Sequence, residues 1–170
     1  VIEHSVTVIG TDYLESIPAF NSGDCSVIEG DEFAAEHYQN GERVCVISDE
    51  LAELNGLKVG DTLPLKVYMS DYDYEKLLTM TYITHYDPLA GFAEEGEWQI
   101  IGIYHSDYEV NGDYDIHPNT VFLPNQSLTK TYKPTYDAKY PDICLSYILP
   151  EGGWNAFEQE ATSLGYAGWF

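Results

Sequence analysis

The chain has 170 residues, of which 44% are hydrophobic, and its 29 acidic against 7 basic residues give a formal net charge of −22. This length fits one domain, or one domain with a small subdomain, and the apolar content excludes a disordered chain. Such an acidic surface repels phosphate backbones, so nucleic acid is not expected as a partner. It would attract cationic peptides, but it also serves simply to keep a secreted domain soluble.

The first forty residues predict short strands and short helical pieces. Apolar residues predict a strand over Ser5–Ile9, and residues 12–20 form a helical turn that Pro18 limits. A turn then leads into the short strand CSVIEG and an acidic corner. The segment FAAEHYQNG predicts a helical fragment that ends at Asn40-Gly41.

Residues 43–68 form the most consistent unit of the sequence. The β-branched run VCVIS (44–48) predicts a buried strand, and Ser48 offers an N-cap hydroxyl to the helix that follows. Asp49 and Glu50 place negative charge on the first turn of this helix, where the helix dipole favours it. Its narrow apolar stripe is supplied by Leu51, Ala52 and Leu54.

In the rest of this unit, glycines mark the end of the helix and a turn. Asn55-Gly56 ends the helix, and Gly60-Asp61 forms a tight turn or bulge. A second strand packs through alternating apolar residues: Leu57, Val59, Leu63, Leu65 and Val67.

Later parts of the chain predict more strands and one amphipathic helix. The strands are expected over residues 77–84, 97–104, 120–123, 142–149 and 166–170. The helix covers residues 154–164, is capped by Gly165, and has one apolar face: Trp154, Phe157, Ala161 and Leu164. The predicted fold class is α+β, with a mainly β lobe over residues 1–128 and a β-α-β element over residues 129–170.

Four segments, in order, carry a family resemblance: SGDCSVIEGDEF, VCVISDELAELNGLKVGDTLPL, EWQIIGIY and TVFLPNQSL. They resemble the extracytoplasmic domain of ABC-transporter permeases, the MacB-like periplasmic core domain. That family includes the macrolide exporter and the cell-division (FtsX-like) permease. Asp31 and Glu32 depart from the pattern, because a basic residue is common there, and residues 72–97 are an insertion.

The resemblance implies a non-catalytic domain on the extracellular face of the cell membrane. Its partners would be its own transmembrane helices and a cytoplasmic ATPase subunit or domain. The sequence has neither a signal peptide nor an apolar run of 18 residues. It starts at Val1 on a β-like segment and stops at Phe170 shortly after a glycine, which is typical of an excerpt from a longer protein. The resemblance implies transmembrane helices on both sides of this excerpt. A cationic peptide or protein is the partner that the charge favours. The alternative is a free-standing secreted β-domain that binds sugar or peptide through surface aromatics.

An acidic loop imitates a calcium site through Asp107, Glu109, Asn111, Gly112, Asp113 and Asp115. The EF-hand pattern requires Asp or Asn where Glu109 stands and a bidentate Glu where Pro118 stands. A hairpin turn stabilised by side-chain to backbone hydrogen bonds explains the same residues, so no metal site is predicted.

No catalytic, cofactor-binding or metal-ligating residue is predicted elsewhere. The five histidines occur singly: His4, His37, His85, His105 and His117. Of these, His105 and His117 could meet across a hairpin. Three widely spaced cysteines predict free buried thiols, with one disulfide as the alternative: Cys25, Cys45 and Cys144.

Seven aromatic residues exceed what one core needs: Trp98, Tyr104, Tyr108, Tyr114, Tyr132, Tyr136 and Tyr140. Exposed aromatics beside acidic residues suit cationic peptides, through cation–π contacts and charge. The alternative is that they cover the outer face of the sheet as alternate strand residues.

Overall fold

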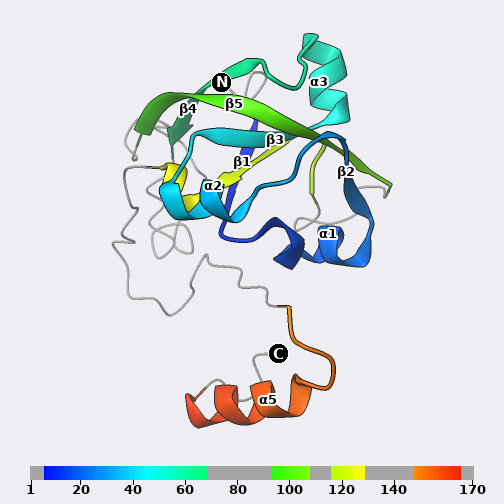
Figure 1. The fold of residues 1–170 in the computed structure, drawn as a ribbon, viewed down its shortest axis with the longest axis vertical. Coiled ribbons are helices and arrows are strands. Elements are labelled where there is room, and N and C mark those ends of the chain that lie inside the picture. The colour runs from blue at the N-terminus through cyan, green and yellow to red at the C-terminus, as the bar shows by residue number, and fades with distance from the viewer. Residues whose placement is uncertain (1–5, 69–92, 108–115, 129–147, 166–170) are drawn as a thin grey trace, which may run out of the picture.

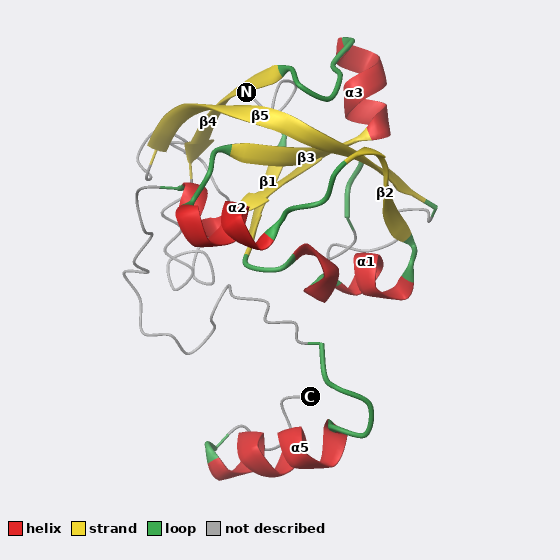
Figure 2. Cartoon of the chain, viewed as in Figure 1, coloured by secondary structure: helices red, strands yellow, loops and turns green. Residues whose placement is uncertain are grey.

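The computed structural model describes residues 6–68, 93–107, 116–128 and 148–165 (Figure 1). These residues confirm the α+β class, because short helices surround a mixed six-stranded sheet (Figure 2). The strands are β1 (Thr7–Thr11), β2 (Cys25–Gly30), β3 (Val44–Ser48), β4 (Thr62–Tyr68), β5 (Ala93–Ser106) and β6 (Thr120–Pro124). The helices are η2 (Leu14–Ser16), α1 (Pro18–Ser22), α2 (Ala35–Asn40), α3 (Asp49–Asn55), η3 (Asn125–Ser127) and α5 (Trp154–Ser163).

The long strand β5 organises the sheet. On one edge it pairs in parallel with β3, with Ser48 opposite Tyr104. On the other edge it pairs antiparallel with β4 along its first half and with β2 along its second half. The strand β6 lies between β3 and β1 and completes the order β1-β6-β3-β5-β2. The strand β4 pairs with β5 on the same edge as β2.

Apolar side chains cover both faces of this sheet. The two faces of β3 alternate, so Cys45 and Ile47 enter one core while Val44 and Val46 enter the other. Leu51 and Ala52 of α3 close the first core, whereas η2, α1 and α2 close the second. Figure 1 accordingly shows α3 on the opposite side of the sheet from α1 and α2. All five residues of β3 are buried, as its continuous apolar run predicts.

Two register shifts adjust the strands that flank β5. One leaves Ile101 as the extra residue between the pairs Cys45–Ile100 and Val46–Gly102. This shift reverses the alternation along β5, so Ile100 and Ile103 both face the first core. The other shift leaves Ile28 as the extra residue of β2.

The unit around α3 confirms most of its predictions. The Ser48 hydroxyl accepts a hydrogen bond from the Leu51 N–H at 3.0 Å, and Gly56 ends the helix with a φ of 65°. The apolar stripe is narrower than predicted, because Leu54 is 79% exposed. The short helix turns only Leu51 and Ala52 towards the sheet.

Other predicted boundaries need correction. The first strand runs from Thr7 to Thr11, two residues past its predicted end, and Ser5 lies outside the described residues. Pro18 opens α1 as its first residue. The C-terminal helix is present and Gly165 follows it with a φ of 92°, but its predicted apolar face is only partly buried: Ala161 is buried and Phe157 is half-buried. Trp154 is 50% exposed, and Leu164 is exposed as well.

Three predicted strands fall largely or wholly outside the described residues: 77–84, 142–149 and 166–170. The division into 1–128 and 129–170 therefore stays a prediction. Of the second part, the structure describes α5 and its flanking residues. Among the described residues, no helix combines the length and the apolar character needed to cross a bilayer.

Candidate functional site

Titratable side chains gather where β3 and β5 end, in a group of Asp49, His105 and Asp107 that we name the His105 cluster. The parallel pairing that sets Ser48 beside Tyr104 also brings the next residues of the two segments together. As a result, Nδ1 of His105 lies 2.5 Å from Oδ2 of Asp49, although the two residues are 56 positions apart. Nε2 of the same ring lies 3.1 Å from Oδ1 of Asp107.

Both ring nitrogens of His105 face a carboxylate, which favours the doubly protonated, cationic ring. The hydrogen bond and the charge of Asp49 raise the pKa of His105, and Asp107 adds to this effect. The two carboxylates contact opposite nitrogens, so they do not converge on a common point. Accordingly, the described residues contain no group of three His, Cys, Asp or Glu side chains that could hold a metal ion.

Ser48 adjoins this cluster, so serine, histidine and aspartate occur close together. A nucleophilic serine needs its hydroxyl hydrogen-bonded to a free histidine nitrogen. Here the Ser48 hydroxyl donates to the carbonyl oxygen of Pro118 and accepts from the Leu51 N–H. Nε2 of His105 contacts Asp107 instead. The described geometry is that of a helix cap and a charge bridge.

A cavity of about 30 Å³ lies beside Ser48, which is room for roughly one water molecule. It is lined by Ser48, Asp49, Glu50, Tyr104, Ser106, Ile116 and Pro118. A cavity of this size is far smaller than the several hundred Å³ typical of small-molecule sites.

The calcium-like loop is described at one residue only, Asp107, whose carboxylate contacts His105. Its other members, residues 109–115, lie outside the described part of the chain. The sequence leaves open that His105 and His117 meet across a hairpin, with solvated loop histidines as the favoured alternative, and none of the contacts of the described residues joins the two rings. The His117 ring instead lies 3.4 Å from the backbone nitrogen of Asn119.

The expectation that Trp98 and Tyr104 are surface aromatics is wrong. Both side chains are 0% exposed, because β5 is covered on both faces. The Trp98 N–H donates to the Ser127 hydroxyl at 3.1 Å, and the Tyr104 hydroxyl donates to the Thr120 carbonyl at 3.2 Å. The five remaining aromatics of that group lie outside the described residues: Tyr108, Tyr114, Tyr132, Tyr136 and Tyr140.

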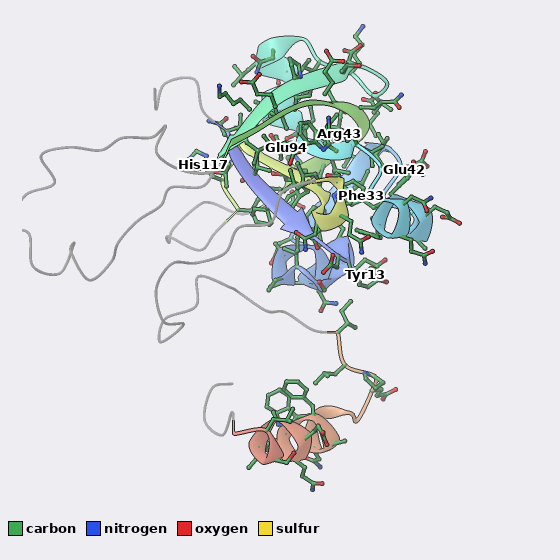
Figure 3. The ribbon with its side chains drawn as sticks, turned by 90° about the vertical axis from the view of Figure 1, so that its left-hand side faces the viewer. Tyr13, Phe33, Glu42, Arg43, Glu94 and His117 are labelled. Carbon is green, nitrogen blue, oxygen red and sulfur yellow. The ribbon has the colours of Figure 1, made fainter. Side chains whose placement is uncertain are left out.

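An ion pair that the sequence does not signal joins the start of β3 to the start of β5. Nη2 of Arg43 lies 2.8 Å from Oε1 of Glu94, a carboxylate that is only 5% exposed (Figure 3). The guanidinium also lies over the Trp98 ring, 5.1 Å from its centre. Gly96 makes room for this arrangement, since a Cβ there would lie 2.6 Å from Arg43. These contacts hold the β4–β5 end of the sheet against β3.

Cys25 and Cys45 are free and buried, as predicted. They enter different cores on opposite faces of the sheet, so they cannot bond to each other. Burial raises the pKa of Cys45 to about 12 and also raises that of Cys25, which makes both thiols unreactive. Cys144 lies outside the described residues.

Neither protein-family models nor curated proteins yield a match to this chain. The polar groups of the described part serve to join elements: Ser48 caps a helix, and both Arg43 and His105 bridge separate segments.

Proposed function

We propose that this chain is the extracytoplasmic domain of an ABC-transporter permease of the MacB-like type. In this role it is non-catalytic and sits on the extracellular face of the cell membrane. It couples ATP hydrolysis by a cytoplasmic subunit or domain to the movement or binding of an extracellular cargo or partner. Its direct neighbours would be its own transmembrane helices.

One observation carries this proposal: the four segments that resemble the family form one contiguous structural unit. The first contains β2, and the second contains β3, α3 and the first part of β4. The third lies within β5, and the fourth contains β6 and η3. The first three meet on β5, and β6 joins them through β3.

The residues within these motifs also have structural roles. Ser48 caps α3, while Gly56 and Gly60 adopt φ values of 65° and 94° that other residues rarely take. Just outside the second and third motifs, the ion pair of Arg43 and Glu94 ties β3 to β5. Packed sheets of this kind deform little, which suits a domain that transmits motion from membrane helices to a partner.

The surface charge supports a cationic partner. The described part contains three of the seven basic residues, and two of them are already paired: Arg43 with Glu94, and Lys66 with Glu95. Most of the described carboxylates are exposed, so the field around the domain favours approach of a positively charged peptide or protein.

The coding sequence on both sides of residues 1–170 provides the first test. We expect apolar stretches of about 20 residues on each flank. The full-length product should then fractionate with membranes and co-purify with an ATPase. A stop codon soon after Phe170, together with an upstream signal peptide, would instead support the free-standing secreted domain. Trp98 and Tyr104 are buried, so these two aromatic residues are not available for the surface binding that this alternative requires.

A further inference from the structure

We propose that the outer edge of β2 docks an extended cationic peptide segment, which joins the sheet as an additional strand. This inference gives a location to the cationic partner and so rests on that part of the proposed function. It does not depend on whether the domain is attached to a permease.

The edge of β2 is open in the described part of the chain. There β2 pairs with β5 alone, from Cys25 opposite Ser106 to Gly30 opposite Gly102. In an antiparallel pair, every second residue of a strand points its N–H and C=O groups away from the partner strand. Those outward groups are the ones that an added strand would bind.

The neighbouring edges are less suited to accept a strand from this partner. β4 continues the same side of the sheet, but Pro64 has no N–H to donate, and the one lysine of the strand, Lys66, already pairs with Glu95. β1 forms the opposite edge of the sheet, and its five residues (TVIGT) carry no charge. Among the strands that the structure describes, β2 alone combines an open edge with negative charge and no proline.

The side chains around β2 define the chemistry of the occupant. Four exposed carboxylates lie on or next to the strand, and no basic residue lies among them: Asp24, Glu29, Asp31 and Glu32. Between them Ile28, the extra residue at the register shift, is 59% exposed. A segment that alternates basic and apolar residues would satisfy both features.

The same charges exclude other occupants. A second copy of this chain would bring the same carboxylates against themselves, and like charges opposite each other destabilise strand pairing. The six residues of β2 extend about 20 Å, so the edge can take a peptide of about six paired residues.

The test uses a peptide of about eight residues that alternates valine and lysine, with an alternating valine–glutamate peptide as its control. We expect the lysine peptide to bind the domain and to slow amide hydrogen exchange within residues 25–30, whereas the glutamate peptide does neither. Binding should weaken as salt rises from about 0.02 to 0.15 M. Unchanged exchange across β2 in the presence of bound peptide would overturn the proposal.

Matched charge reversals separate this edge from the general acidity of the chain. Glu29→Lys with Asp31→Lys should lower the affinity about tenfold or more. Glu50→Lys with Glu53→Lys makes the same change in net charge on exposed positions of α3 and should lower it less than about threefold. Equal losses in the two double variants would overturn the proposal, because only net charge would then matter.

A single variant at the exposed Ile28 provides a third measurement that needs no change in the core. Ile28→Lys places a positive charge on the edge and should abolish the slowed exchange in β2. Persistent protection in this variant would contradict the docking site. Failure of all peptide binding would leave the permease assignment standing, because the flanking sequence and co-purification test it separately.

Discussion

Two tryptophans in this chain should respond very differently to the same truncation. Trp98 is 0% exposed, donates to Ser127 and supports the guanidinium of Arg43. Trp98→Ala removes a fully buried side chain, and such changes cost about 3–5 kcal/mol. For a chain of this size, each kcal/mol lowers the melting temperature by about 2–4 °C, so we expect a drop of roughly 6–20 °C.

Trp154 gives the matched comparison. It is 50% exposed and packs against Phe157, with the ring centres 5.9 Å apart. Because half of its surface already faces water, Trp154→Ala should cost only about 1–2 kcal/mol. This replaces the value of about 3 kcal/mol or more that the sequence suggests for a helix anchor.

Urea denaturation followed by circular dichroism measures both variants. Trp98→Ala should lower the midpoint at least twice as far as Trp154→Ala, with similar slopes. The hydrogen bond can be isolated with Trp98→Phe, Ser127→Ala and the double variant. Each single change leaves one buried group unpaired, so the double should cost less than the sum of the singles. Equal midpoints for the two alanine variants, or strict additivity in the cycle, would refute this reasoning.

Three further predictions concern the helix cap at Ser48, two glycine turns and the His105 cluster. Ser48→Ala should lower the free energy of unfolding by about 0.5–2 kcal/mol, because the Leu51 N–H loses its cap. Ser48→Thr should retain most of the stability of the cap, and chemical denaturation compares the two variants. Gly56→Val and Gly60→Val should each lower the free energy of unfolding by about 1 kcal/mol or more, because both positions have positive φ. The space around an added Cβ is open at both positions, so backbone strain is the cause. Unchanged melting temperatures would contradict this. Because the pKa of His105 is raised in the folded state, its ion pairs contribute stability in full below the ordinary value of 6.5 and lose it as pH rises through the raised value. Stability measured from pH 5 to 9 should therefore show a decline that His105→Gln removes; an identical pH profile for the variant would show that the bridge contributes nothing.

Local signals in the sequence predicted local structure well. The hydroxyl of Ser48 lies three residues from the N–H that it caps, and Gly56 lies directly after the helix that it ends. The role of Pro18 does not follow from the sequence alone, because proline is compatible both with the end of a helix and with its first turn.

Contacts between distant segments were not predictable. Asp49 and His105 meet only because β3 and β5 pair in parallel in one register. Trp98 and Tyr104 are buried because both faces of β5 are covered. The extra residue Ile101 also moves the residues that follow it in β5 to the opposite face from the one that simple alternation predicts. A one-residue shift of this kind exchanges the two faces of a strand, so alternation read from sequence fails beyond it.

The position of β1 has a consequence for biosynthesis. Its only partner among the described strands is β6, and Thr7 pairs with Thr120. A ribosome adds about 5–20 residues per second, so β1 waits roughly 6–20 s for that partner to be made. The five-residue segment TVIGT carries no charge, and during this interval it is an apolar segment open to mispairing. Chaperone or translocon engagement of this nascent segment would therefore affect the yield of this domain more than its final stability.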